Sequence, residues 1–190
     1  MKIIEEKILR EGKIINNDII KVDSFLNHQI DVSLIHEFAQ EVREWMAGRR
    51  VDKVLTIEAS GIAIAFAVAE QLGAIPLVFA KKSKSATVDD NVYKATIKSF
   101  TRNVESEVTV AKPYLKEGER ILIVDDFLAE GNAAFGLINI CNQAKARVLG
   151  LAAVVEKRFQ GGRERLEKEG YDVFAGASIK EFKDNVPVFY

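Results

Sequence analysis

The sequence predicts an α/β domain in which a central parallel sheet is flanked by helices and interrupted by an inserted antiparallel hairpin. Short apolar runs of strand length alternate with segments of helical periodicity, the pattern of a parallel sheet that is covered on both faces. The 190 residues are enough for one domain with a substantial core, and no repeat or Pro/Gly/Ser-rich linker divides them. We therefore expect a single domain over residues 1–190.

Before the sheet, the chain is expected to form a helix, two short extended pieces and a longer helix. Apolar residues at helical spacing run from Lys2 to Arg10. The extended pieces, Ile14-Ile15 and Ile19–Val22, flank an Asn-Asn-Asp turn. The longer helix is predicted from about Asp31 to Ala47.

Four buried strands are predicted after this helix. Ligands of such sheets bind at the carboxyl ends of the strands, so the loops that follow the strands matter most. The strands are expected at Val54–Ile57, Pro76–Ala80, Ile121–Val124 and Val148–Val155, and the helices between and after them at Ile62–Leu72, Ala133–Ala144 and Arg163–Glu169.

The segment from about Lys81 to Val110 breaks this alternation. Its apolar residues recur at two-residue spacing, which predicts an antiparallel hairpin inserted between two parallel strands. A mobile cover, or flap, over a site is one good reason for such an insertion. Lys81, Lys82 and Lys84 open the segment, and they either neutralise an anion or lie on a solvated surface.

Composition and charge exclude several classes of function. With 27 Lys+Arg against 28 Asp+Glu, the net charge of -1 gives no general attraction to nucleic acid or to an acidic membrane surface. No apolar run is long enough to span a membrane and no secretory h-region is found, so we expect a cytoplasmic protein. Cys141 lies in an apolar stretch and is expected to be a packed thiol, and His28 and His36 lack metal-ligand spacing, so no metal site on the protein is expected.

The strongest chemical signal lies between Ile121 and Ala134. Four apolar strand residues are followed by Asp125 and Asp126, then by a loop of small residues and a helix. Successive backbone N–H groups at the start of a helix form an anion site, and carboxylates beside it can accept hydrogen bonds from sugar hydroxyls. The pattern therefore predicts a sugar-phosphate site, with the phosphate bound by Ala129, Glu130, Gly131, Asn132 and Ala133.

A second strand-to-helix loop, Glu58-Ala59-Ser60-Gly61, predicts another backbone anion site. The alternative is an ordinary turn in which Ser60 caps the following helix. Neither GxxxxGK[ST] nor GxGxxG is present, which argues against a generic nucleotide-binding domain.

The segment from Ile121 to Ala134 resembles the phosphoribosyl pyrophosphate signature of the type I phosphoribosyltransferases, in which a strand and two acids precede a Thr-Gly-x-Thr loop. Here Glu130 and Ala133 stand at the threonine positions. Five blocks, in order and covering nearly the whole chain, look like the xanthine phosphoribosyltransferases of Gram-positive bacteria, in which the loop also lacks the threonines. These blocks are Ser24–Gln29, Ile57–Ala63, Phe79–Lys82, Asp125–Ala129 and Glu156–Arg163.

This resemblance implies a type I phosphoribosyltransferase fold, with a base-binding hood formed by about residues 1–30 and the C-terminal segment, and a flap at about 81–110. It implies an enzyme of purine salvage that transfers the phosphoribosyl group to xanthine, with Mg²⁺ carried mainly by the pyrophosphate, and a homodimer. Asp125 and Asp126 would be catalytic. Ser60, Gly61, Lys81 and Lys82 would join the Ala129–Ala133 loop in binding phosphoribosyl pyrophosphate, and Ile20, Asn27, Lys157 and Phe159 would bind the base.

Two alternatives stay open on the sequence. The first is a guanine or hypoxanthine phosphoribosyltransferase, because the amide of Asn27 can donate to an oxo group or accept from an amino group. The second is a non-catalytic regulator that senses phosphoribosyl pyrophosphate. The N-terminal segment is too short and too acidic to supply the DNA-binding appendage that such a regulator needs.

Overall fold

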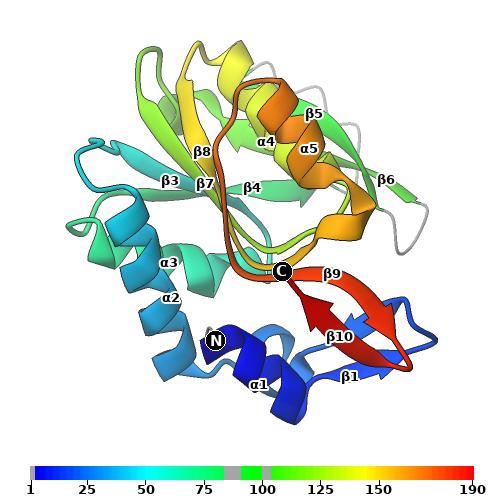
Figure 1. Ribbon diagram of the computed structural model, residues 1–190. Helices are drawn as coiled ribbons and strands as arrows, with labels where there is room; N and C mark the ends of the chain where they lie inside the picture. Colours follow the sequence, from blue (N-terminus) through cyan, green and yellow to red (C-terminus); the bar gives the residue numbers. More distant parts are fainter. Residues whose placement is uncertain (1–2, 84–90, 100–103) are drawn as a thin grey trace.

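The computed structural model describes residues 3–83, 91–99 and 104–190 (Figure 1). Within these residues the main sheet has eight strands in the order β10-β9-β8-β7-β3-β4-β6-β5, and a separate sheet pairs β1 with β2. The helices are α1 (Ile3–Glu11), α2 (Val32–Trp45), α3 (Gly61–Gln71), α4 (Asn132–Gln143) and α5 (Gly162–Lys168). The strands are β1 (Lys13–Ile15), β2 (Ile19–Lys21), β3 (Lys53–Ile57), β4 (Leu77–Ser83), β5 (Val92–Ser99), β6 (Val104–Ala111), β7 (Arg120–Leu128), β8 (Arg147–Lys157), β9 (Val173–Lys183) and β10 (Val186–Phe189).

The parallel centre of the sheet confirms the fold predicted from the sequence. β3 pairs in parallel with β4 and with β7, and β7 continues the parallel order to β8 and β9. Two points differ from the prediction. β7 runs on to Leu128 rather than ending at Val124, because its backbone stays paired with β8 as far as Glu156. β9 and β10 were not predicted as strands.

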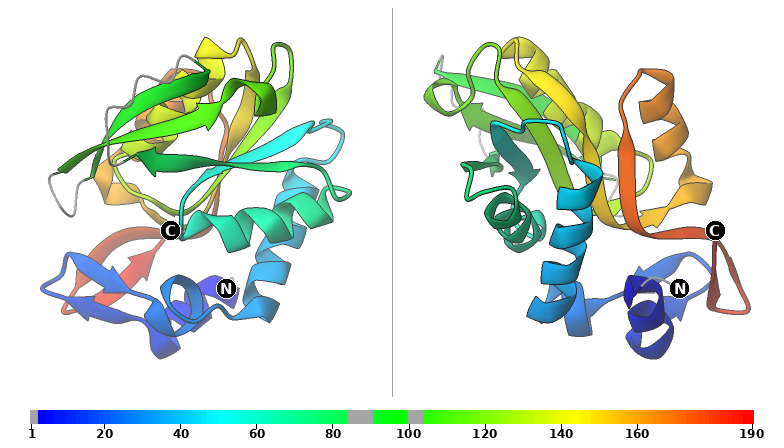
Figure 2. Two further views of the ribbon diagram at one scale, coloured as in Figure 1. Left: turned by 180° about the vertical axis from the view of Figure 1, so that it is seen from behind. Right: turned by 60° about the vertical axis from the view of Figure 1, so that its left-hand side comes forward.

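Helices cover both faces of this sheet, as the alternation of apolar runs predicted (Figures 1 and 2). One core contains side chains of α2 and α3 packed on residues such as Val54 and Leu122, and the other contains those of α4 packed on Leu55 and Ile123. Successive residues of a strand point to opposite faces, so each central strand contributes to both cores. This packing leaves the carboxyl ends of the strands as the edge where loops gather.

The insertion forms the antiparallel hairpin predicted by its two-residue spacing. β5 pairs with β6, and β6 pairs with the end of β4, so the hairpin extends the main sheet. Its buried face contacts α4, where a Cβ atom at Gly136 would overlap the side chain of Ile97. Residues 84–90 and 100–103 of the predicted flap, including Lys84, lie outside the described residues.

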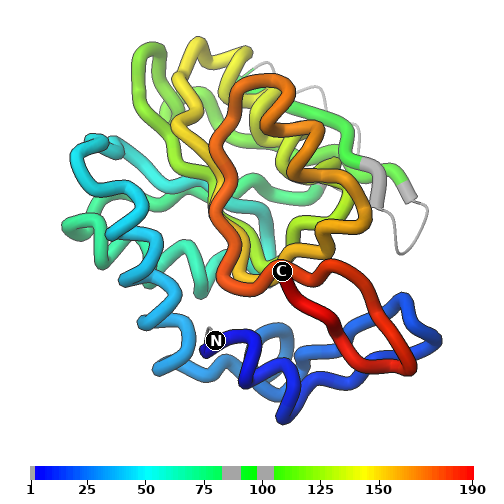
Figure 3. The backbone as a smooth tube through the Cα atoms, in the orientation of Figure 1, coloured from blue at the N-terminus to red at the C-terminus, as the bar shows by residue number. Residues whose placement is uncertain are grey.

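The two ends of the chain lie side by side. α1 and the β1–β2 hairpin lie beside the β9–β10 hairpin, which ends the main sheet at the bottom of the view of Figure 1, and Figure 3 traces both chain ends to this place. We call this part of the structure the hood, after the base-binding hood predicted at about residues 1–30 and the C-terminal segment. In the part of the chain that the structure describes, no helix has the length and apolar character needed to cross a membrane.

Candidate active site

The loops predicted to carry chemistry all follow parallel strands and therefore gather at one edge of the sheet. The ends of β3, β7 and β8 point toward the hood, as the two views of Figure 2 show. The predicted anion-site loops follow β3 and β7, and two of the residues expected to bind the base, Lys157 and Phe159, lie at the end of β8 and in the turn after it. The fold thus brings the predicted substrate-binding segments to a common edge.

Asp125 and Asp126 lie in the last part of β7 and differ in burial. Asp125 is 7% exposed and its Oδ1 accepts a hydrogen bond of 2.9 Å from the backbone N–H of Asp126. Oδ1 of Asp126 in turn accepts from the N–H of Phe127 at 3.0 Å. Burial raises the pKa of Asp125 well above its usual value, the neighbouring carboxylate of Asp126 raises it further, and the charge of Lys82 opposes the rise.

Gly61, the first residue of α3, lies against this carboxylate. A Cβ atom at Gly61 would be 3.3 Å from Oδ1 of Asp125 and would overlap Oγ1 of Thr56. Thr56 is fully buried on β3, and its hydroxyl oxygen has no hydrogen-bond partner among the described residues. Sequence reasoning missed Thr56, because a threonine inside an apolar strand is ordinary. Its unpaired hydroxyl marks this spot as polar.

In the loop between β3 and α3, the candidate anion site consists of backbone N–H groups rather than of side chains. Ser60 makes no side-chain capping bond, and the peptide between Glu58 and Ala59 is cis. The N–H groups at the start of a helix have no partner within the helix and can bind an anion. Here the N–H of Ile62 donates to the Ala59 carbonyl oxygen at 3.2 Å, so Ser60 and Gly61 are the candidate donors. The carboxylate of Glu58 accepts a hydrogen bond of 2.6 Å from the backbone N–H of Lys82, which ties this loop to β4.

The two described lysines of the basic cluster point to opposite faces of β4. Lys81 is paired with Thr109 and Lys82 with Val108, and neighbouring residues of a strand alternate in direction. Both side chains are exposed, and Lys82 is close enough to Asp125 to affect the pKa of its carboxyl group. The structure therefore brings Lys82 to the paired acids, whereas Lys81 projects from the other face.

The loop from Ala129 to Ala133 joins β7 to the start of α4. Gly131 has φ 84°, in the left-handed region that favours glycine, and its carbonyl oxygen accepts from the N–H of Phe135 at 2.9 Å. Gly162 of α5 packs so closely on this loop that a Cβ atom there would be 2.9 Å from the backbone N of Gly131. The close packing of Gly162 and the hydrogen bond from its N–H to the Ala129 carbonyl oxygen, 3.1 Å, hold this loop in shape.

Glu130 does not stand alone in this loop. Its carboxylate accepts a hydrogen bond of 3.0 Å from the side-chain amide of Asn132. The guanidinium of Arg165 donates to the Glu130 carbonyl oxygen at 2.5 Å and to Oδ1 of Asn132 at 3.3 Å, and it stacks 4.8 Å from the ring centre of Phe135. Sequence reasoning missed Arg165, because it lies among other charged residues on a short helix and carries no local signal of a role.

Two of the residues expected to bind the base, Lys157 and Phe159, lie at the end of β8 and in the turn after it. Nζ of Lys157 donates to the backbone carbonyl oxygen of Asp18 at 3.0 Å. Burial lowers the pKa of Lys157, and the carboxylate of Asp18 opposes this shift. Phe159 is 44% exposed and its ring meets that of Phe182 edge-on, with centroids 5.5 Å apart. A partly exposed aromatic ring is suited to stacking on a flat heterocycle.

The other two predicted base contacts lie in the N-terminal segment. Asn27 is exposed and ends the π-helical turn η1 (Asp23–Asn27), in which Phe25 and Leu26 are buried. Ile20 is 7% exposed and belongs to the core on the α2 and α3 side. Ile20 is in the β1–β2 hairpin that also carries Asp18, so it belongs to the same hairpin as the partner of Lys157.

Glu156 and Arg163, two further residues of the last block, form a buried ion pair. Nε of Arg163 donates to Oε1 of Glu156 at 2.7 Å and its NH2 donates to Oε2 at 2.8 Å. Ser178 adds a bond of 2.8 Å to the same carboxylate, which is 1% exposed. The pair fixes the end of β8 against α5 and β9, immediately before Lys157.

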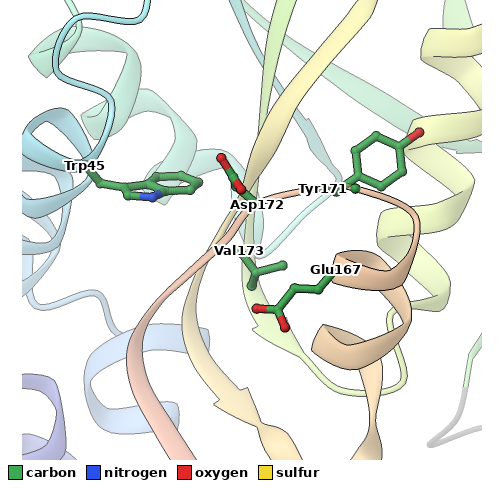
Figure 4. Close-up of a pocket in the computed structure, with 6 residues that line it drawn as sticks. Trp45, Glu167, Tyr171, Asp172 and Val173 are labelled. Atoms are coloured by element: carbon green, nitrogen blue, oxygen red, sulfur yellow. The ribbon is translucent and has the colours of Figure 1, made fainter.

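Other features of the described residues lie apart from this edge. The His, Cys, Asp and Glu side chains in the described ranges form no cluster of three or more that could hold a metal ion. Cys141 is buried, which raises the pKa of its thiol to about 12. A hollow of about 410 Å³ lies at the amino end of β9 and is lined by Trp45, Glu167, Gly170, Tyr171, Asp172 and Val173. Figure 4 shows the side chains around it. No predicted site residue lines it.

Comparison with known proteins identifies the family. The chain is 47% identical over 184 residues to a xanthine phosphoribosyltransferase of Lactobacillus acidophilus, with 97% of this chain and 95% of that protein covered. It is 54% identical over 162 residues to a xanthine phosphoribosyltransferase of Clostridioides difficile, with 85% of each chain covered.

Among solved structures, the adenine phosphoribosyltransferase of Giardia lamblia, complexed with 9-deazaadenine, shares the fold. The TM-score is 0.77 at 20% identity, and the match covers 94% of this chain and 98% of that one. The family model for the phosphoribosyl transferase domain matches residues 21–188. The match spans the chain from α2 to β9 and includes both anion-site loops, and the chain therefore belongs to the phosphoribosyl transferase family.

Proposed function

We propose that this protein is a xanthine phosphoribosyltransferase, which converts xanthine and phosphoribosyl pyrophosphate to xanthosine 5′-monophosphate and pyrophosphate. The observation that carries the proposal is the agreement with proteins of that name over nearly the whole chain, including 46% identity over the full length of one from Clostridium perfringens. The agreement includes the segments on which the base-binding residues lie.

In the proposed reaction, a purine nitrogen forms a bond to C1 of the ribose while the bond from C1 to the pyrophosphate oxygen breaks. The pyrophosphate leaves with the bonding electrons, so positive charge grows on the ribose ring, as in glycoside chemistry. Asp125 and Asp126 accept hydrogen bonds from the ribose hydroxyls and favour the cationic ring. The proton on the attacking nitrogen is lost after the bond has formed.

The phosphate groups are assigned to the two helix starts. The N–H groups of Gly131, Asn132 and Ala133 bind the 5′-phosphate, and those of Ser60 and Gly61 bind the pyrophosphate. Lys82, whose charge already acts on Asp125, adds positive charge to the pyrophosphate side. Lys81 projects from the other face of β4 and would serve a substrate in a neighbouring subunit if the protein is a homodimer.

Magnesium fits this site as a companion of the substrate. The described residues provide no cage of carboxylates and imidazoles, so the ion would be held mainly by pyrophosphate oxygens and water. Bound in this way, magnesium supplies charge stabilisation for the leaving pyrophosphate.

The flap at about 81–110 is proposed to exclude water from the cationic ribose. We further propose that the enzyme works in the cytoplasm, in purine salvage.

The base is assigned to the edge between β8 and the hood. Lys157 donates a hydrogen bond to the 6-oxo group, Phe159 stacks on the ring, and Ile20 contacts the ring. The amide of Asn27 donates to the 2-oxo group, which xanthine has and hypoxanthine lacks. A site built around such a bond rejects the analogue that leaves the donor unpaired.

A panel of bases tests this function. The protein is incubated with phosphoribosyl pyrophosphate, Mg²⁺ and each purine in turn, and the nucleotide formed is measured. Xanthine is expected to exceed guanine and hypoxanthine by about a hundredfold in kcat/KM, which corresponds to about 2.7 kcal/mol. A preference for guanine would overturn the assignment at the 2-position but leave the reaction class intact, and binding of phosphoribosyl pyrophosphate without any product would indicate a regulator.

A further inference from the structure

The hood consists of two hairpins whose turns face each other. The β1–β2 turn contains Asn16 and Asn17 with φ 53° and 52°, and the β9–β10 turn contains Asp184 and Asn185 with φ 52° and 58°. Asparagine and aspartate tolerate this left-handed backbone better than most residues, which explains the composition of both turns. Figures 1 and 3 show the two hairpins side by side.

Asn17 and Asn185 join these turns by a reciprocal pair of hydrogen bonds. The backbone N–H of Asn17 donates to Oδ1 of Asn185 at 3.0 Å, and the N–H of Asn185 donates to Oδ1 of Asn17 at 2.6 Å. The two residues are 168 positions apart in the chain. Each side chain thus accepts a hydrogen bond from the turn N–H of the opposite hairpin. The pair therefore links the N-terminal and C-terminal parts of the hood.

The next residue along the chain connects this pair to the base site. The carbonyl oxygen of Asp18 accepts a hydrogen bond from Nζ of Lys157 at 3.0 Å, and the N–H of Asp18 donates to the Ile15 carbonyl at 3.2 Å. A lysine ammonium has three N–H donors. With one donor directed at Asp18, the other two take fixed directions, and one of them is available to an oxo group of a purine.

The aromatic residue of the base site depends on the same hairpins. Phe159 meets Phe182 edge-on at 5.5 Å, and Phe182 lies on β9 shortly before the turn that carries Asn185. Movement of the β9–β10 turn would therefore affect both the ammonium and the ring that face the base.

We propose that Asn17 and Asn185 are positioning residues for the purine, acting through the Asp18 carbonyl on the ammonium group of Lys157. The proposal rests on the proposed function, because it takes Lys157 as the group that binds the 6-oxo atom. The pair itself does not touch the base. It fixes the position and direction of the Lys157 ammonium group. It therefore affects the affinity for the base and not the affinity for phosphoribosyl pyrophosphate.

The test is the variant Asn185→Gly, because glycine accepts a φ of 58° without strain and removes only the side-chain amide. KM for xanthine is expected to rise about fivefold to tenfold, while kcat and KM for phosphoribosyl pyrophosphate stay within about twofold. Asn185→Asp, which keeps a side-chain acceptor, should restore KM for xanthine. Asp184→Gly changes the neighbouring turn residue and is the matched control, for which no change in KM is expected.

Measurements in the Lys157→Ala variant separate the assignment of Lys157 to the base from the positioning role of Asn17 and Asn185. Lys157→Ala should raise KM for xanthine, and Asn185→Gly should have no further effect in that background. If Lys157→Ala leaves KM for xanthine unchanged, the assignment of the base site is wrong. If Lys157→Ala raises KM but Asn185→Gly does not, the base site stands and the positioning role is overturned. Equal effects of Asn185→Gly on both substrates would also overturn it.

Discussion

The phosphate end and the base end of the proposed site are built in different ways. Asp125 and the loop at Gly131 belong to β7 and the start of α4, in the middle of the sheet, and backbone hydrogen bonds and close packing hold them. Lys157 and Phe159 face hairpins from the two ends of the chain, which side-chain contacts fasten together. The proposed chemistry thus rests on the centre of the sheet, whereas the proposed recognition of the base rests on contacts between hairpins from the two ends of the chain.

The largest effect is expected at the phosphate end. Asp125→Asn removes the negative charge that faces the ribose and should lower kcat by about a hundredfold, with KM for xanthine within twofold. Steady-state kinetics with each substrate varied in turn measure both values. A change in KM for xanthine comparable to that in kcat would contradict the separation between the two ends.

The same carboxyl group predicts how activity and stability depend on pH. Because burial, the Asp126 carboxylate and Lys82 together leave the pKa of Asp125 raised, kcat/KM for phosphoribosyl pyrophosphate should decline on the acid side at a higher pH than for an ordinary aspartate. For stability the sign is reversed. An acid with a raised pKa in the folded state loses stability as pH rises through the interval between its unfolded and folded pKa, so Asp125→Asn should be at least as stable as the wild type at neutral pH.

The second effect concerns the buried ion pair between Glu156 and Arg163, which lies next to Lys157 at the base end. Glu156→Gln leaves the guanidinium of Arg163, whose side chain is 12% exposed, without its paired charge. The free energy of unfolding should fall by about 3 kcal/mol, measured by denaturant titration. Glu167→Gln is the matched control, since Glu167 contacts the same guanidinium from an exposed position, and it should cost less than about 0.5 kcal/mol. Similar losses in both variants would mean that the buried ion pair contributes no more to the free energy of unfolding than the exposed contact does.

The smallest expected effect sharpens the account of the phosphate loop. Arg165 donates to Oδ1 of Asn132 and to the Glu130 carbonyl oxygen. From this position we expect its charge to offset that of the Glu130 carboxylate beside the proposed phosphate site. Arg165→Gln should raise KM for phosphoribosyl pyrophosphate about fivefold and leave KM for xanthine unchanged. Glu130→Gln in the same chain should reverse most of that loss, because the two charges are then both absent. If the double variant is as impaired as Arg165→Gln alone, the charge of Glu130 is not the cause.

Several elements followed from local sequence alone. The buried strands around Val54, Ile121 and Val148 were predicted because apolar runs of strand length need burial on both faces. Asp125 and Asp126 were placed near the end of a strand for the same reason, and the extension of β7 to Leu128 moved that end by only a few residues. The resemblance of short blocks supplied the family and the base-binding residues, which periodicity does not provide.

What the tertiary structure decided are the contacts between segments far apart in the chain. Polar turns such as Asn16-Asn17 and Asp184-Asn185 are common, and nothing local tells which turn meets which. The different exposure of Asp125 and Asp126, the opposite directions of Lys81 and Lys82, and the contact of Arg165 with the phosphate loop also depend on neighbours that folding brings together. The sequence alone determined which groups are candidates for the chemistry, because residue type and local periodicity are local properties. The tertiary structure decided their burial, direction and partners, because these depend on packing between distant segments.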